Sequence, residues 1–146
     1  MAQREKAEEE LRRLSMEMRY LEQTADALQQ RISMVNAALS DLNFANMTLD
    51  GIEMEKENAE LLVPIGGGSY VKVKLADPNK VIVGMGAGVS VEKTLQEAKT
   101  ALKERLDELE KTMNSAQQQF TQVADRINKG RGRLESMLST AREGKP

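Results

Sequence analysis

A heptad repeat occupies the first 47 residues and limits the folds open to this chain. This segment contains no glycine and no proline. Apolar residues recur in it at alternating intervals of three and four, at Leu11, Leu14, Met18, Leu21, Ala25, Leu28, Ile32, Val35, Leu39 and Leu42. Such spacing gives a helix one apolar seam, meaning a row of residues that faces a partner helix. The segment is therefore predicted to be a coiled-coil helix, whose pattern fades between about 45 and 52, near Asn46 and Gly51.

A second heptad repeat follows a helix start near Thr94. The letters "TLQE" fit a capping box, in which the Thr94 hydroxyl and the Glu97 carboxylate satisfy each other's backbone N–H groups. The seam residues are Leu102, Leu106, Leu109, Met113, Ala116, Phe120, Val123, Ile127, Gly130, Leu134, Met137 and Ala141. Because each helix has one apolar stripe and the segment between them reverses the chain, an intramolecular antiparallel coiled coil is favoured. A parallel coiled coil between chains is the alternative.

From Leu61 onward, the segment between the helices becomes rich in Val, Ile, Gly and turn residues. It reads "LLVPIGGGSYVKVKLADPNKVIVGMGAGVSV" and alternates apolar with polar residues around Val71, Val73 and Leu75, a pattern typical of half-buried strands. Four short strands are predicted at about 61–65, 69–75, 80–85 and 88–92, joined at "GGG", "DPN" and "GAG". Strands this few and short make no stable core alone, so further strands from other chains are expected.

The amino-acid composition argues against most kinds of catalysis and metal binding. The chain has no cysteine and no histidine, so thiolate nucleophiles and the commonest general base and metal ligand are missing. The "GMGAG" run has Val89 where a dinucleotide fingerprint needs its third glycine, and "GGGS" lacks the ending of a P-loop. No enzyme activity, catalytic residue, cofactor or metal site is predicted. Both glycine runs are interpreted as hairpin turns.

Charge and hydropathy indicate a cytoplasmic protein that binds neither nucleic acid nor membrane. The net charge is −2, and no apolar run approaches the roughly 20 residues that span a bilayer. The start "MAQREKAEEE" is too charged for a signal peptide. The runs "REKAEEE" and "KGRGR" are interpreted as solvated helix faces that form weak exposed pairs.

The chain ends carry the candidate binding residues, since an antiparallel coiled coil brings them together, away from the strands. Gly130 stands at a seam position there and Gly132 follows; a helical glycine costs about 1 kcal/mol relative to alanine and packs no side chain. The coiled coil is therefore expected to be weak here, and flexible methionines suit varied apolar partners. The candidate contacts for unfolded polypeptide are Leu11, Leu14, Met16, Met18, Leu134, Met137 and Leu138. Fraying without a function is the alternative.

The order of long helix, two β-hairpins and long helix, with "LLVPIGGGSYVKVKLADPNKVIVGMGAGVSVEKT" between the helices, closely resembles the α-class subunit of archaeal prefoldin. The two hairpins favour the α class over the β class. The resemblance implies a hexamer of two α and four β subunits, with an oligomeric double β-barrel built from hairpins. The residues expected in that assembly are Val63, Ile65, Tyr70, Val71, Val73, Leu75, Val81, Val83, Val89 and Val91.

The resemblance also implies the function of a molecular chaperone. An ATP-independent holdase of this kind binds unfolded proteins at the coiled-coil tips and delivers them to a group II chaperonin. The alternative is a structural, filament-forming assembly subunit of the same fold.

The predicted fold class is α+β, mainly α. The predicted organisation is an N-terminal coiled-coil helix at 1–50, a connector at 51–60, two hairpins for oligomerisation at 61–93 and a C-terminal coiled-coil helix at 94–143.

Overall fold

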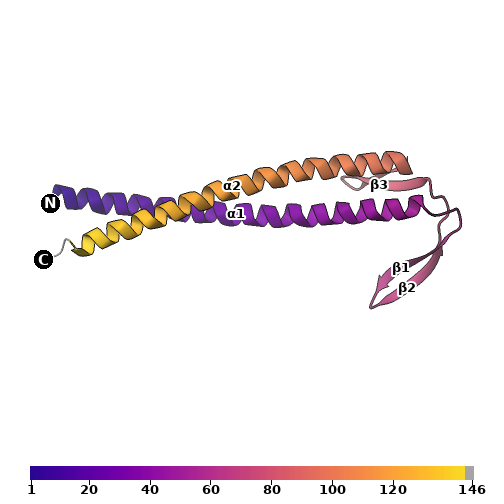
Figure 1. Ribbon diagram of the computed structural model, residues 1–146, viewed down its shortest axis with the longest axis horizontal. Coiled ribbons are helices and arrows are strands. Elements are labelled where there is room, and N and C mark those ends of the chain that lie inside the picture. Colours follow the sequence, from indigo (N-terminus) through magenta and orange to yellow (C-terminus); the bar gives the residue numbers. More distant parts are fainter. Residues whose placement is uncertain (144–146) are drawn as a thin grey trace. The chain divides into compact units, whose positions relative to one another are not determined.

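Two long helices with two β-hairpins between them in the chain make up the computed structural model, which describes residues 1–143 (Figure 1). The elements are α1 Ala2–Glu53, β1 Glu60–Gly66, β2 Ser69–Lys74, β3 Lys80–Gly86, β4 Val89–Thr94 and α2 Leu95–Glu143. The mainly α fold class and the order of elements predicted from the sequence are confirmed. Helix α1 continues through Gly51 and ends at Glu53.

The chain divides into two compact units, and each takes a part of both helices. We call the first the terminal unit; it contains Met1–Asn36 and the part of α2 from Lys111 onward. We call the second the hairpin unit; it contains Ala37–Glu110.

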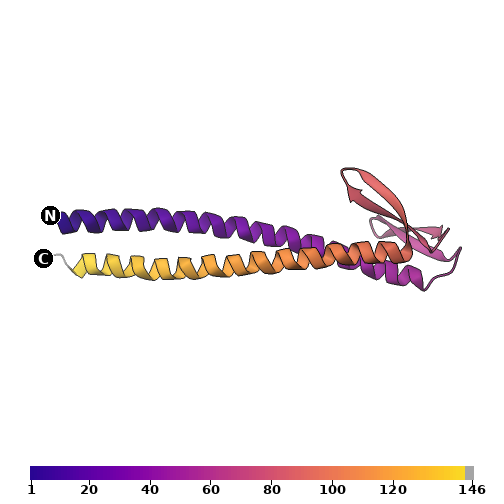
Figure 2. The ribbon, with the colours of Figure 1, turned by 90° about the horizontal axis from the view of Figure 1, so that it is seen from above.

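In the terminal unit, the first part of α1 and the last part of α2 run antiparallel, so that the start of α1 and the end of α2 lie at the same end in all three ribbon views (Figure 2). Met18, Leu21 and Ile127 form a buried cluster, against which Ala25, Val123 and Leu134 pack. Further seam residues, Leu28, Val35, Met113 and Ala116, are also buried. The predicted seam therefore forms the core of this unit.

In the hairpin unit, β3 packs against the helices. Val83 is buried in one cluster with Leu49 of α1 and with Leu95 and Ala98 of α2. The Arg105 guanidinium also donates a hydrogen bond to the Gly84 carbonyl at 2.7 Å. Strand β3 is thus held to the start of α2 by apolar packing and by one charged donor.

The start of α2 shows half of the predicted capping box. The Glu97 backbone N–H donates to the Thr94 hydroxyl at 3.2 Å, which satisfies one of the free N–H groups of the first helical turn. Thr94 is also the last residue of β4, where it lies opposite Lys80, and the Leu95 N–H donates to the Asn79 carbonyl at 3.0 Å. The strand therefore runs directly into the helix without a connecting loop.

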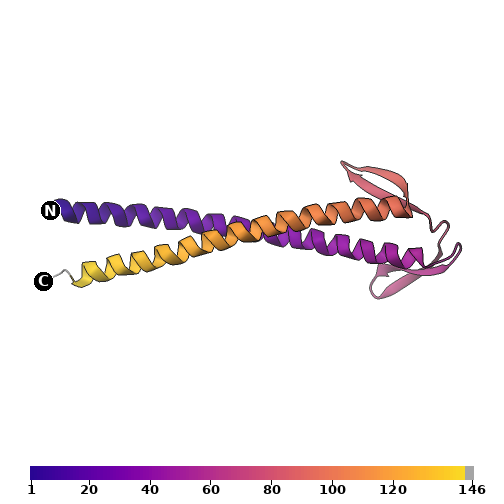
Figure 3. The ribbon, with the colours of Figure 1, turned by 45° about the horizontal axis from the view of Figure 1, so that its top comes forward.

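The two hairpins form separate two-stranded sheets built to one plan (Figure 3). Val63 pairs with Val71 in the first, and Val83 pairs with Val91 in the second. Both shift register just before the turn, and both turns have positive φ throughout. Gly67 has φ +59 and its counterpart Ala87 has φ +53, a left-handed conformation typical of type I′ hairpin turns. The glycine runs are therefore turns, and Val63 and Val83 occupy equivalent positions.

Candidate functional site

The candidate contacts at the chain ends differ in exposure. Met16 and Leu138 lie off the seam, and their exposed fractions are 67% and 42%. Leu11, Leu14, Leu134 and Met137 are half-buried between the helices. Met18 is only 7% exposed and belongs to the core of the terminal unit. Met16 and Leu138 can therefore meet another chain directly, whereas Met18 can do so only if the helices separate.

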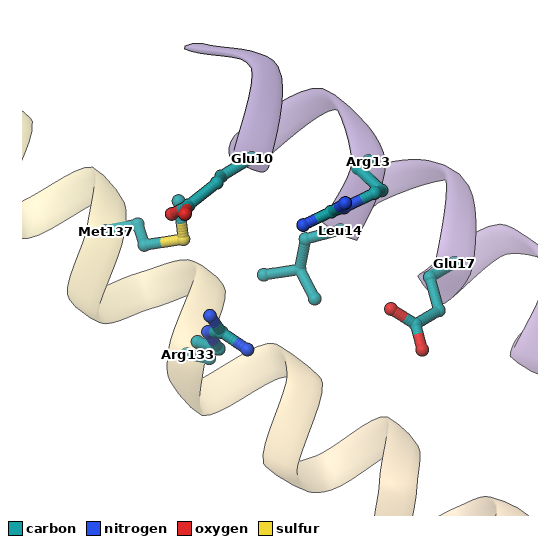
Figure 4. A pocket seen from close by; sticks show the side chains of 6 residues that line it. All are labelled: Glu10, Arg13, Leu14, Glu17, Arg133 and Met137. Carbon is teal, nitrogen blue, oxygen red and sulfur yellow. The ribbon is translucent and has the colours of Figure 1, made fainter. Parts of the chain in front are cut away.

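A depression between the two helices brings Leu14 and Met137 together. Its volume is about 70 Å³. Its lining consists of Glu10, Arg13, Leu14, Glu17, Arg133 and Met137. Figure 4 shows Leu14 and Met137 projecting from facing helices, with charged side chains from both helices around them. The depression thus combines two apolar side chains with a charged rim formed by the other four.

The charged rim was not predicted from the sequence, although the heptads hold a signal for it. Glu10, Glu17 and Arg133 each stand one position before a seam residue, where charged side chains flank a coiled-coil seam. Among residues 1–143, Arg131 and Glu22 make the ion pair between the helices of this unit, at 3.7 Å and with both side chains exposed. Within the described residues, Arg13 and Arg133 form no ion pair.

The sequence analysis expected a weak coiled coil at Gly130, and in the structure the Met18 side chain fills the space beside this glycine. A Cβ built on Gly130 would overlap the Met18 Sδ and lie 3.4 Å from its Cε. The thioether therefore occupies the volume that any other residue at position 130 would need for its own side chain. A Cβ built on Gly132 meets nothing within 4 Å. The two glycines thus differ: one receives a side chain from α1, and the other only lowers helix propensity.

The residues expected to serve assembly lie mostly exposed on the hairpins. The exposed ones are Val63, Ile65, Tyr70, Val71, Val89 and Val91. Val73, Leu75 and Val81 are half-buried. Val83 is the exception, because it is 4% exposed and packs on the chain's own helices. The hairpins also expose Leu62, Ile82 and Met85, which the alternation pattern did not single out.

Within residues 1–143, no cluster of three or more His, Cys, Asp or Glu side chains is arranged to hold a metal ion. None of the helices in this described range has the length and apolar character needed to cross a membrane.

A pair of long helices that pack through heptad seams, with two small antiparallel hairpins between them in the chain, defines the class of protein. Residues 21–137 match the Prefoldin family, described as prefoldin subunit. Prefoldin subunit alpha of Methanococcoides burtonii is 32% identical over 123 residues, which cover 84% of this chain and 89% of the relative. Prefoldin subunit alpha of Pyrococcus horikoshii is 34% identical over 128 residues, which cover 87% and 84%.

Solved structures agree on the fold. The filamentous PFD from Methanocaldococcus jannaschii, solved by cryo-EM, has a TM-score of 0.65 at 22% identity and covers 77% of this chain and 93% of that chain. The crystal structure of the prefoldin beta subunit from Thermococcus strain KS-1 has a TM-score of 0.58 at 17% identity and covers 87% and 90%. At these identities, the likeness speaks for the fold alone.

The chain therefore belongs to the prefoldin subunit family, and its relatives above are α-class subunits of archaea, as the resemblance in the sequence predicted. A chaperone-type subunit is the function that this family membership supports.

Proposed function

We propose that this chain is a subunit of an ATP-independent holdase that binds unfolded polypeptides through the terminal unit. The observation that carries the proposal is the exposure of two apolar side chains, Met16 and Leu138, on the same stretches of α1 and α2 that carry the half-buried Leu14 and Met137. Exposed methionine and leucine adapt to apolar segments of varied sequence. Each contact is weak, so firm binding depends on several subunits acting together.

The hairpins are proposed to join subunits. Relatives of this chain include subunits named alpha and beta, which supports an assembly with β-class partners and a second α subunit, in the α2β4 hexamer that the resemblance implies. Isolated two-stranded sheets are at best marginally stable in water, and both hairpins expose valines that pairing with further strands would cover. Transfer of the held polypeptide to a group II chaperonin completes the proposed function.

Replacement of Met16 and Leu138 by glutamine tests the binding surface. The double variant should assemble as the parent does but suppress the aggregation of a chemically denatured test protein several-fold less well. Both residues are exposed and off the seam, so the coiled coil should be unaffected. Light scattering during dilution of the denatured protein measures the activity, and native mass spectrometry measures the assembly.

A matched control makes the same kind of substitution at exposed positions elsewhere on α1. Met34 and Met47 are also exposed methionines of α1, and Met34→Gln with Met47→Gln should leave the suppression unchanged. If the Met16/Leu138 variant held the test protein as well as the parent, the surface would be misassigned. If the parent formed open filaments instead of closed particles with a β-class partner, the structural alternative would replace the hexamer.

A further inference from the structure

We call the space beside the Gly130 backbone, which the Met18 side chain fills, the Gly130 socket. Gly130 contributes only backbone to it, and the Met18 sulfur lies where the Cβ of any other residue would be. The surroundings are apolar, since Leu21 and Ile127 are buried beside Met18 and Leu134 packs against them. If Met18 left, the vacant space would match an unbranched apolar side chain.

The Met18 side chain is suited to leaving the Gly130 socket. Methionine is unbranched and has three rotatable side-chain bonds, so it can adopt alternative positions at little cost. Gly130 and Gly132, two positions apart, weaken the helix that forms the other wall, because each costs helix stability relative to alanine. Gly132 does so without any packing that compensates, as nothing lies near its would-be Cβ. Local opening of α2 at 130–132 therefore requires less free energy than opening of an alanine-rich turn.

The socket lies beside the surface proposed to hold unfolded polypeptide. Leu14 lies about one turn before Met18 on α1, and Arg133 lies about one turn after Gly130 on α2; both line the neighbouring depression together with Met137. A polypeptide held on this surface would bring its own apolar side chains within reach of the space that Met18 fills.

We propose that the Gly130 socket is a binding site for one unbranched apolar side chain, which is Met18 in the closed chain and a methionine-like side chain of the bound polypeptide in the open one. The inference rests on the proposed holdase function and specifies the chemistry of its ligand. β-Branched side chains fit the socket poorly, since they branch next to their own backbone and are stiff at χ1, whereas the Met18 sulfur that fills the socket lies at the far end of an unbranched chain. Met18 thus competes with the ligand and releases the site only when a suitable side chain is present.

The test uses the full chain and an unstructured peptide with one photo-methionine, a methionine analogue whose diazirine cross-links on irradiation. Cross-links are expected within one turn of Gly130 on α2 and beside Leu21 on α1. Gly130→Ala should reduce their yield about tenfold, because the new methyl group and the displaced Met18 exclude a side chain whose burial supplies much of the affinity. Met18→Ala should raise the yield several-fold by removing the competitor.

Gly132→Ala is the matched control, because it adds the same methyl group to the same helix in open space and so reports the gain in helix stability alone; it should lower the yield much less than Gly130→Ala does. An unlabelled peptide with methionine should compete better than one with valine. Circular dichroism confirms that each variant folds, and Gly130→Ala reports on the socket even if Met18→Ala unfolds. Equal yields from the parent and Gly130→Ala, with aggregation still suppressed, would overturn the socket alone. Absence of peptide binding and of suppression by the parent would overturn the proposed function and the socket with it.

Discussion

Lys99 connects the end of α1 to the start of α2 within the hairpin unit. Its ammonium lies 2.9 Å from Asp50 Oδ1 and also forms an ion pair and hydrogen bond with Glu53. Gln96 Nε2 donates to the other Glu53 oxygen at 3.0 Å. The hydrogen bond from Lys99, together with its charge, lowers the pKa of Glu53 below its usual value. The same carboxylates raise the pKa of Lys99, with the Glu53 hydrogen bond as the largest cause.

Glu53→Gln should make the stability of the chain less sensitive to acid. A carboxyl with a lowered pKa stabilises the folded state fully above its unfolded pKa, about 4.3 for glutamate, and this stability is lost as pH falls through the lowered folded value. The variant should therefore melt below the parent at pH 7, and the difference should shrink in that acid window. Thermal unfolding followed by circular dichroism at several pH values measures this.

The control for this residue is Glu57→Gln, in the segment that follows α1. Glu57 is exposed and is not part of the Lys99 cluster, so its removal should leave the pH profile of the parent unchanged. Because Glu53 is solvent-exposed, added salt should weaken the effect of Glu53→Gln. A difference in melting temperature between the parent and Glu53→Gln that stayed constant from pH 7 into the acid window would contradict the assigned pKa shift.

At the scale of elements, the equivalent valines of the two hairpins should respond differently to truncation. Val83→Ala should destabilise the unassembled chain by about 2 kcal/mol, because it removes buried methyl groups and leaves a cavity against Leu49, Leu95 and Ala98. Val63→Ala should cost well under 1 kcal/mol in the same measurement, since Val63 is 43% exposed. Urea unfolding of the chain without partners gives both values.

If the exposed face of the first hairpin joins subunits, the two substitutions should affect assembly in the opposite order from their effect on folding stability. Val63→Ala should then weaken association with a β-class partner, measured by sedimentation. Val83→Ala should leave association unchanged once temperature and concentration keep the chain folded. An equal loss of folding stability in both variants would mean that the first hairpin also packs on its own chain.

The hairpins also show where prediction from the sequence ends. The β-like composition places Val63 and Val83 in predicted strands, and the turn letters locate both reversals, so the strands and turns followed from local patterns. Alternation does not say what covers a face. The helix pair covers Val83 and leaves Val63 open, and this difference comes from tertiary packing with Leu49 and Ala98.

The same limit holds for the helices. Three-four spacing identified the seam, including Met18, Leu21 and Ile127, because a heptad fixes which side of a helix meets its partner. It does not say which side chain of one helix enters which gap of the other. Gly130 was therefore expected to leave a weak point, although Met18 from α1 fills it.

At the scale of the whole molecule, the two units should lose protection from hydrogen exchange separately. Their buried clusters share no residue: Met18, Leu21 and Ile127 belong to the terminal unit, and the cluster around Val83 belongs to the hairpin unit. Leu21→Ala removes a buried leucine side chain, a change that typically costs 2–5 kcal/mol. Amides in 1–36 and 111–143 should then exchange faster, whereas those in 37–110 keep the protection of the parent.

Val83→Ala should give the complementary pattern, with faster exchange in 37–110 and unchanged protection around Leu21 and Ile127. Mass spectrometry of peptic fragments resolves the two regions in one experiment. Because α1 and α2 each contribute to both units, continuous helix could instead transmit the loss along its hydrogen bonds. Uniform loss of protection in both variants would show a single cooperative unit, and binding at the terminal unit would then be coupled to the packing of β3.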